Sequence, residues 1–209
     1  MVEINNIADI VLHLEGIKTV IFDMDDTLYS EKEYVKSGYK CVSECVPNVD
    51  NAEKKLWQFF ADDKSAIDEL LMTEGIYTNE LQAACIKTYR YQVPDIHLYL
   101  GVKEMLISLR QQGYNIGIIT DGRVEGQEAK IKVLQLDKLV DKIIITDSLG
   151  GIEFRKPCPQ SYFLMSEHFK TNYSDMIYVG DNPKKDFIAC EKLGIKAVYF
   201  ANQDGLYSK

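Results

Sequence analysis

The sequence predicts an α/β protein with a doubly wound, mostly parallel sheet and an all-helical segment inserted after the first strand. Three observations carry this prediction. Short, nearly continuous apolar runs recur along the chain, as in strands that are buried on both faces. Segments with helical periodicity separate these runs, which is the order expected of right-handed βαβ crossovers. The interval between the first two runs, residues 24–115, contains no strand-like segment.

The predicted strands are rich in β-branched residues, and several of them end in Asp, Thr or Gly. They span residues 19–23, 116–120, 142–146, 176–180 and 196–200. In an open, Rossmann-like sheet of this kind, ligands bind where the carboxyl ends of the strands meet the following loops. The polar residues that follow these runs are therefore candidates for a functional site.

Four helices are predicted between these strands. The first has an apolar face made of Val102, Met105, Leu106 and Leu109, and Gly113 follows it as a natural stop. The others are predicted at residues 125–136, 157–169 and 183–193. Pro157 and Pro183 lie near the starts of the last two, where a missing N–H is tolerated, and Gly194 follows the end of the last.

The segment between the first two strands is predicted to be an all-helical insertion. Its apolar residues form four helical faces, which are Tyr34, Val35, Tyr39, Val42 and Val46; Leu56, Trp57 and Phe60; Ile67, Leu70 and Leu71; and Leu81, Ala84, Cys85, Thr88 and Tyr89. Asp50 and Glu53 have the spacing of a capping box before the second helix. We therefore predict two domains, an α/β core of residues 1–29 and 96–209 and a helical domain of residues 30–95.

The composition and charge of the chain restrict its function. The 209 residues are 46% apolar and 27% charged, which excludes wholesale disorder. The 32 acidic and 24 basic side chains give a net charge of −8, which argues against binding of a nucleic-acid polymer. No secretory signal and no apolar stretch of roughly 20 residues is visible, so no membrane association is expected.

The five cysteines have no CxxC pair, which is typical of a reducing compartment and predicts a cytoplasmic protein. Cys41 and Cys45 are spaced i, i+4 on a predicted helix and could share a metal ion, but only three histidines are available elsewhere, and buried or incidental thiols are the favoured interpretation.

Carboxylates cluster after two of the predicted strands. Asp23, Asp25 and Asp26 directly follow the first strand, and three carboxylates within four residues repel one another unless a positive charge lies among them. Asp181 and Asp186 follow the fourth strand at the same edge of the sheet. Hard oxygen ligands of this kind are what Mg²⁺ prefers, so the sequence predicts a magnesium site here.

Groups suited to a phosphate oxygen follow the other strands. Thr120 offers a hydroxyl, and Asp121 and Gly122 offer backbone amides. Lys156 could place an ammonium group at the same point. Taken singly, Thr120 could instead be a helix N-cap and Lys156 a surface charge. Together with the carboxylates, these residues describe a pocket for a cation and a tetrahedral anion.

These motifs resemble those of the haloacid dehalogenase superfamily, in its phosphatase branch. The resemblance rests on DxDDTL at residues 23–28, Thr120, Lys156 within Arg-Lys-Pro, and GDxxxxD at residues 180–186. It covers essentially the whole predicted core. The helical insertion between the first two motifs resembles the C1-type cap of that superfamily, which closes over the active site and helps to select the substrate.

The resemblance implies a phosphatase that uses Mg²⁺ and an aspartyl-phosphate intermediate. In that mechanism Asp23 is the nucleophile and Asp25 is the general acid and base, whose pKa is expected to be raised. Thr120 and Lys156 hold the phosphate oxygens, and Asp26, Asp121 and Gly122 offer backbone amides. The implied Mg²⁺ ligands are Asp23, Asp181 and the main-chain carbonyl of Asp25. Asp186 orients Lys156 or a metal-bound water, and Arg155 could reach a second anionic group of the substrate.

Alternative functions stay open at this point. A phosphomutase shares the same motifs, and a non-catalytic binding module could retain the fold. A dehalogenase is disfavoured because that branch lacks the acid at the position of Asp25. The expected partner is a small phosphorylated metabolite such as a sugar phosphate or nucleotide, and the sequence predicts neither its identity nor an oligomeric state.

Overall fold

The computed structural model describes residues 1–206, and these residues separate into two compact units. Unit 1 comprises Met1–Glu31 and His97–Lys209, and unit 2 comprises Lys32–Ile96. The last three residues of the predicted core domain, 207–209, lie outside the described residues. Within the described residues, no helix has the length and apolarity needed to cross a membrane.

Unit 1 is built on a six-stranded parallel sheet, counted over the described residues. Its strands lie in the order β1-β6-β5-β2-β3-β4. Their bounds are β1 (Val2–Ile4), β2 (Thr19–Phe22), β3 (Asn115–Thr120), β4 (Lys142–Ile145), β5 (Met176–Gly180) and β6 (Lys196–Phe200). The predicted doubly wound α/β sheet is confirmed. The edge strand β1 was not predicted, because three residues are too few to show a periodic pattern.

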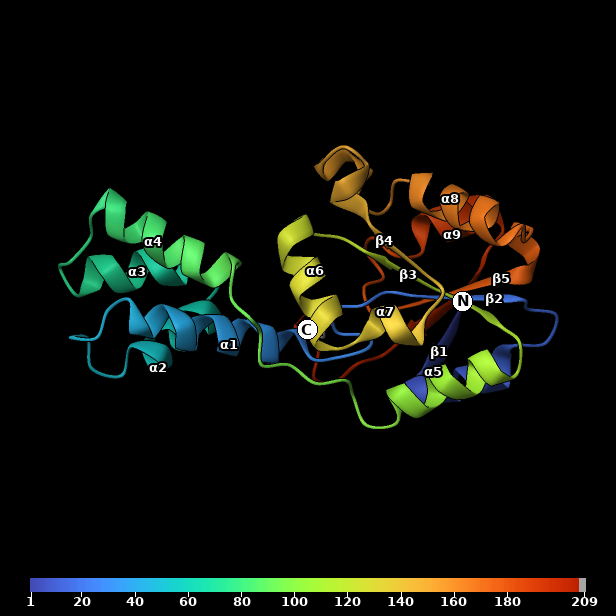
Figure 1. Cartoon of the computed structure of the whole chain (residues 1–209), viewed down its shortest axis with the longest axis horizontal. Coiled ribbons are helices and arrows are strands. Elements are labelled where there is room, and N and C mark those ends of the chain that lie inside the picture. The colour runs from blue at the N-terminus through green and yellow to red at the C-terminus, as the bar shows by residue number, and fades with distance from the viewer. Residues whose placement is uncertain (207–209) are drawn as a thin grey trace. The chain divides into compact units, whose positions relative to one another are not determined.

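Helices cover both faces of this sheet (Figure 1). The helices of unit 1 are α5 (Val102–Gln111), α6 (Val124–Val133), α7 (Leu136–Leu139), α8 (Gln160–Phe169) and α9 (Ile188–Leu193), with 3₁₀ turns η1 (Ile7–His13), η2 (Thr146–Leu149), η3 (Ile152–Phe154) and η4 (Tyr173–Asp175). On the α8 and α9 face, Tyr162 and Met165 pack with Ile21, Ile119 and Tyr178 of the strands, all of them buried. This packing fixes the sheet from which the site residues project.

Three predicted helices have different bounds in the structure. The predicted helix at residues 125–136 is divided into α6 and α7 because Gln135 adopts a left-handed conformation with φ of 54°. Helix α8 begins at Gln160 rather than at 157, and α9 begins at Ile188 rather than at 183. The residues after Pro183 form turns instead, so the loop that follows β5 continues to the start of α9.

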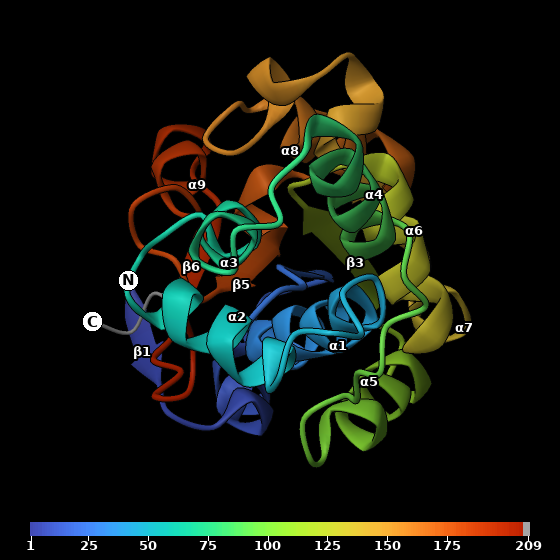
Figure 2. The same ribbon diagram turned by 90° about the vertical axis from the view of Figure 1, so that its left-hand side faces the viewer.

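Unit 2 contains four helices, and Figure 2 shows them from a second direction. They are α1 (Glu31–Glu44, whose first residue belongs to unit 1), α2 (Ala52–Ala61), α3 (Ala66–Thr73) and α4 (Asn79–Arg90). The half-buried rings of Phe60 and Tyr89 both contact the buried Tyr39, so aromatic contacts contribute to the packing of this unit. The predicted capping box at Asp50 and Glu53 is wrong, because the N-cap of α2 is Asn51 and its side chain makes no capping hydrogen bond.

Candidate active site

The central strand β2 brings the predicted site residues together. It pairs with β3 on one side and β5 on the other, so that Phe22 lies opposite both Ile118 and Val179. The backbone N–H of Asp23 donates to the carbonyl of Val179 at 2.8 Å, which extends this pairing by one residue. The loops that follow β2, β3 and β5 therefore meet at one edge of the sheet.

A buried lysine lies at the centre of this edge. The Nζ of Lys156 is 2.6 Å from Oδ1 of Asp23 and 2.8 Å from Oδ1 of Asp186, and it donates to the hydroxyl of Tyr178 at 2.8 Å. Burial alone would lower the pKa of Lys156, but the carboxylates of Asp186 and Asp23 raise it well above its usual range. Lys156 is thus a buried, charged group that joins two carboxylates, and the surface-charge interpretation is wrong.

Asp186 is fixed from several sides. Its Oδ2 accepts a hydrogen bond from the backbone N–H of Asn182 at 2.9 Å, and its main-chain carbonyl accepts one from the hydroxyl of Tyr162 at 2.9 Å. The Asp186 side chain is completely buried. Because it contacts Lys156 directly, its carboxylate fixes the position of that ammonium group.

Gly180 makes this arrangement possible, and its replacement is our first prediction. A Cβ at position 180 would lie 2.5 Å from Oδ2 of Asp186, too close for the carboxylate to stay in place. We expect Gly180→Ala to destabilise the protein by about 1–3 kcal/mol and to lower kcat, because Asp186 and Lys156 must shift. Thermal unfolding and steady-state kinetics on one preparation measure both effects.

Gly113→Ala is the matched control for this prediction. Gly113 has φ of 88°, and a Cβ at this position would meet only open space, so alanine there strains the backbone away from the site. It should lower Tm without lowering kcat. A Gly180→Ala protein with the Tm and kcat of the wild type would contradict the close approach of Asp186.

Three carboxylates of this edge could hold a metal ion. Oxygen atoms of Asp23, Asp181 and Asp186 lie within 4.8 Å of one another. Burial and the neighbouring carboxylates raise the pKa of Asp181 to about 8. Burial raises the pKa of Asp23 to about 6 despite the opposing effect of Lys156. No comparable ligand group forms around Cys41 and Cys45 within residues 1–206, so the structure does not support the metal site considered there.

Asp25 is held by four hydrogen-bond donors. Its Oδ1 accepts from Lys130 at 2.6 Å and from the Tyr29 hydroxyl, and its Oδ2 accepts from Gln127 at 2.8 Å and from Thr120 at 3.4 Å. Burial raises the pKa of Asp25, but Lys130 and the hydrogen bonds outweigh it and lower the pKa below its usual value. The expected raised pKa of Asp25 is therefore wrong for this structure.

Thr120, the last residue of β3, and the two residues after it have defined conformations and contacts. The hydroxyl of Thr120 accepts a hydrogen bond from Gln127 at 2.5 Å, and the N-cap of α6 is Arg123, so Thr120 is not a helix cap. The carboxylate of Asp121 accepts from the Thr146 hydroxyl at 2.9 Å and from the backbone N–H of Lys156 at 3.0 Å. Gly122 has φ of 140°, a conformation that favours glycine.

Asp26 and Arg155 make structural contacts. The carboxylate of Asp26 accepts hydrogen bonds from the backbone N–H groups of Glu31 at 2.8 Å and Leu206 at 2.7 Å. Arg155 forms a bidentate pair with Asp147, both hydrogen bonds being 2.7 Å long. The Asp26 side chain and the Arg155 guanidinium thus already have protein partners, and only the backbone of Asp26 remains a candidate for phosphate binding.

Several residues of this edge were not predicted from the sequence. They are Tyr29, Gln127 and Lys130 around Asp25, Tyr178 beside Lys156, and Lys185, whose Nζ lies 3.4 Å from Asp121. Gln127 and Lys130 are both buried on α6, at a spacing of i, i+3. The available signal was weak, because a buried helix face that carries Gln and Lys looks polar and exposed in the sequence.

Comparison with known proteins gives the following relationships. A family model described as haloacid dehalogenase-like hydrolase matches residues 20–200. The glyceraldehyde 3-phosphate phosphatase of Pyrococcus abyssi is 27% identical over 196 residues, which cover 88% of this chain and 81% of the relative. The pyrophosphatase PpaX of Bacillus mycoides is 26% identical over 188 residues, covering 87% of this chain and 82% of the relative.

Two solved structures are similar in fold. A haloacid dehalogenase-superfamily hydrolase from Geobacter sulfurreducens has a TM-score of 0.66 at 16% identity, covering 88% of this chain and 87% of that one. The hydrolase YfnB from Bacillus subtilis, bound to magnesium, has a TM-score of 0.63 at 20% identity, covering 88% of this chain and 87% of that one.

Proposed function

The chain belongs to the haloacid dehalogenase-like hydrolase family, and from this premise we propose that it is a Mg²⁺-dependent phosphatase of a small phosphorylated metabolite. The observation that carries the proposal is the buried Lys156, which joins Asp23 and Asp186 beside Asp181 at the carboxyl ends of β2 and β5. A lysine and several carboxylates in one small volume suit a tetrahedral anion and a cation together.

The carboxylate set fits a magnesium ion. Asp23 and Asp181 supply hard oxygen donors that are close together, and their pKa values are raised first by burial and then by neighbouring carboxylates, both of which a cation would offset. Asp186 is better suited to hold Lys156, because both of its carboxylate oxygens already accept hydrogen bonds. We assign Asp23, Asp181 and the main-chain carbonyl of Asp25 as ligands. When bound, Mg²⁺ neutralises negative charge between the nucleophile and the phosphate.

Asp23 is the proposed nucleophile. Oδ1 of Asp23 accepts from Lys156, so Oδ2 is the oxygen that attacks phosphorus. The new bond joins Oδ2 to phosphorus, and the bond between phosphorus and the ester oxygen breaks. An aspartyl-phosphate results, which divides one difficult displacement into two easier ones.

Asp25 is the proposed general acid and base. In the first step its carboxyl proton passes to the leaving ester oxygen. In the second step its carboxylate takes a proton from water, which attacks phosphorus and releases inorganic phosphate from Asp23. The lowered pKa in this structure means that Asp25 must gain its proton when substrate changes its surroundings.

The phosphate oxygens are held by Thr120, Lys156 and nearby backbone amides. Lys156 is charged and fixed by Asp186, so its positive charge is in place to stabilise developing negative charge, and its Nζ can exchange the contact with Tyr178 for a phosphate oxygen. The Thr120 hydroxyl and the amides of Asp26, Asp121 and Gly122 complete the proposed phosphate site, and Asp121 itself is fixed by Thr146.

Unit 2 is the proposed cap domain. It is a separate helical unit inserted between β2 and β3, at the position of a C1-type cap. The named relatives include a glyceraldehyde 3-phosphate phosphatase and a pyrophosphatase, which support a small phosphorylated substrate for this chain. We propose that the cap determines which metabolite is accepted, and that the protein works in the cytoplasm.

Removal of the metal is our second prediction. Purified protein, assayed for inorganic phosphate release against a panel of phosphorylated metabolites, should be active with Mg²⁺ and lose at least about 99% of its activity in EDTA. Mg²⁺ at 100 times its Kd should stabilise the protein by about 2.7 kcal/mol, which thermal unfolding detects. The matched control is Asp181→Asn, whose Tm should not respond to Mg²⁺.

The same panel tests the proposed reaction. Unequal rates across the panel would identify the substrate class, and phosphate release without isomerised product would exclude a phosphomutase. Full activity in EDTA would contradict the metal requirement. Absence of turnover on every compound would favour a non-catalytic module.

A further inference from the structure

The carboxylate of Asp25 accepts hydrogen bonds from four different side chains. Two donors reach Oδ1, Lys130 at 2.6 Å and the hydroxyl of Tyr29, and two reach Oδ2, Gln127 at 2.8 Å and Thr120 at 3.4 Å. A carboxylate has about four lone-pair positions, so these contacts occupy all of them. A group in this state cannot carry a proton to a leaving oxygen until one donor departs.

Two of the donors come from one helix. Gln127 and Lys130 lie on the same face of α6, and both side chains are buried. Nε2 of Gln127 also lies 2.5 Å from the Thr120 hydroxyl and 3.0 Å from the carbonyl of Asp121, so its two hydrogens are shared among three acceptors. Through these contacts of Gln127, helix α6 connects Asp25, on the loop after β2, to the end of β3.

The four donors differ in what substrate binding would do to them. Thr120 makes the longest hydrogen bond to Asp25, and it is also a proposed phosphate ligand. When a phosphate oxygen takes the Thr120 hydroxyl, Oδ2 of Asp25 loses that donor and gains a free lone pair. Lys130, Tyr29 and Gln127 have no proposed contact with phosphate, so they continue to donate hydrogen bonds to Asp25.

We propose that Lys130 and Gln127 are positioning residues that hold Asp25 for proton transfer, while Thr120 passes from Asp25 to the bound phosphate. This inference rests on the proposed function, because it takes Asp25 to be the general acid and base. The freed Oδ2 carries the proton that goes to the leaving oxygen as its bond to phosphorus breaks. The same atom then accepts a proton from the attacking water.

The test compares two leaving groups. β-Glycerophosphate needs a proton on its departing alkoxide, whereas p-nitrophenyl phosphate releases a stable anion and needs little help. For Lys130→Met we expect kcat/KM, which reports transfer of the phosphoryl group to Asp23 and not the later hydrolysis, to fall about 100-fold on β-glycerophosphate and less than about 5-fold on p-nitrophenyl phosphate. Gln127→Met should show the same pattern with a loss of about 10-fold on β-glycerophosphate.

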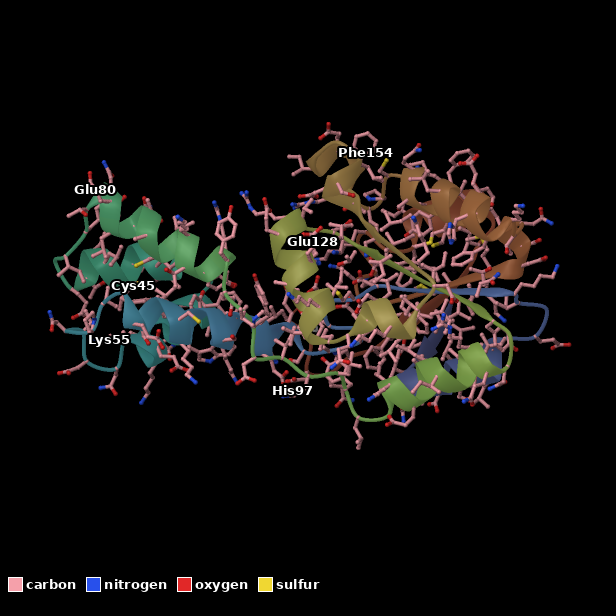
Figure 3. All side chains as sticks on the ribbon, in the orientation of Figure 1. Cys45, Lys55, Glu80, His97, Glu128 and Phe154 are labelled. Carbon is pink, nitrogen blue, oxygen red and sulfur yellow. The ribbon has the colours of Figure 1, made fainter. Side chains whose placement is uncertain are left out.

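The ratio of the two kcat/KM values is the informative readout, because it leaves out the hydrolysis of the aspartyl-phosphate that both substrates share. Both rates are measured on one preparation, so the ratio does not depend on the fraction of folded enzyme, even though Lys130→Met removes a buried charge. Lys132 and Glu128, of which Figure 3 labels the second, are exposed residues of the same helix, so Lys132→Met and Glu128→Ala should leave the ratio at the wild-type value.

Asp25→Asn separates the possible outcomes. It should change the ratio by about 100-fold or more in the same direction. If Asp25→Asn changes the ratio but Lys130→Met and Gln127→Met do not, the positioning role is wrong and the proposed function stands. If Asp25→Asn leaves the ratio unchanged, Asp25 is not the general acid, and both proposals fail.

Discussion

Asp23→Asn is expected to lower phosphatase activity by about 10⁴-fold or more, because an amide oxygen is a poor nucleophile towards phosphorus. The assay is hydrolysis of p-nitrophenyl phosphate in the presence of Mg²⁺. The variant should still fold. The substitution replaces a buried carboxyl group by a neutral amide. Burial raises the pKa of that carboxyl group to about 6, so its ionised form is already disfavoured, and Lys156 keeps Asp186 as a partner.

Asp137→Asn is the matched control, since it makes the same chemical change at an exposed position of α7. Its activity should equal that of the wild type. Hydrolysis by Asp23→Asn at the wild-type rate would show that the nucleophile has been assigned wrongly.

Lys156→Met is expected to have the largest effect on stability. Removing the ammonium group leaves Asp23 and Asp186 buried without their shared counter-charge. Breaking a buried ion pair in this way costs about 3–5 kcal/mol, so Tm should fall sharply and activity should disappear. Lys103→Met removes an exposed lysine of α5 and should change neither property.

The double variant Lys156→Met with Asp186→Asn distinguishes the two roles of the lysine. It removes one of the two facing carboxylates, so it should recover part of the lost stability. It should not recover activity, because the phosphate still lacks its ammonium partner. A stable and fully active Lys156→Met protein would contradict the central place of Lys156 in this site.

The fold was predictable because its strands are buried on both faces. Runs such as residues 176–180 are almost entirely apolar, and each corresponds to an observed strand. The turns were less predictable. Gln135 in a left-handed conformation divides one predicted helix, and nothing in its side chain indicates that conformation. The short strand β1 obtains its structure from pairing with β6 rather than from its own pattern.

The strand-end residues of the candidate site were predictable from their position. Asp23 and Asp181 follow β2 and β5, and Thr120 is the last residue of the neighbouring β3, so the topology of a parallel sheet brings all three to one edge. Lys156 follows no strand directly, and its placement rests on contacts with Asp23 and Asp186 that only the folded chain shows.

The surroundings of Asp25 were not predictable. The implied role of Asp25 as acid and base led us to expect a raised pKa, but Lys130 and Gln127, more than 100 positions along the chain, help to lower the pKa instead. The pKa of a buried carboxyl depends on every element packed against it. Sequence neighbours supply only part of that set.

A phosphoenzyme trap tests the central claim most directly. Wild-type protein is mixed with Mg²⁺ and p-nitrophenyl phosphate, quenched in acid during turnover, digested and examined by mass spectrometry. We predict one phosphoryl group on the peptide that contains Asp23, located on that residue by fragmentation and absent from Asp23→Asn. A phosphoryl group on another residue, or phosphate release during turnover with no phosphorylated peptide at any quench time, would contradict the aspartyl-phosphate mechanism.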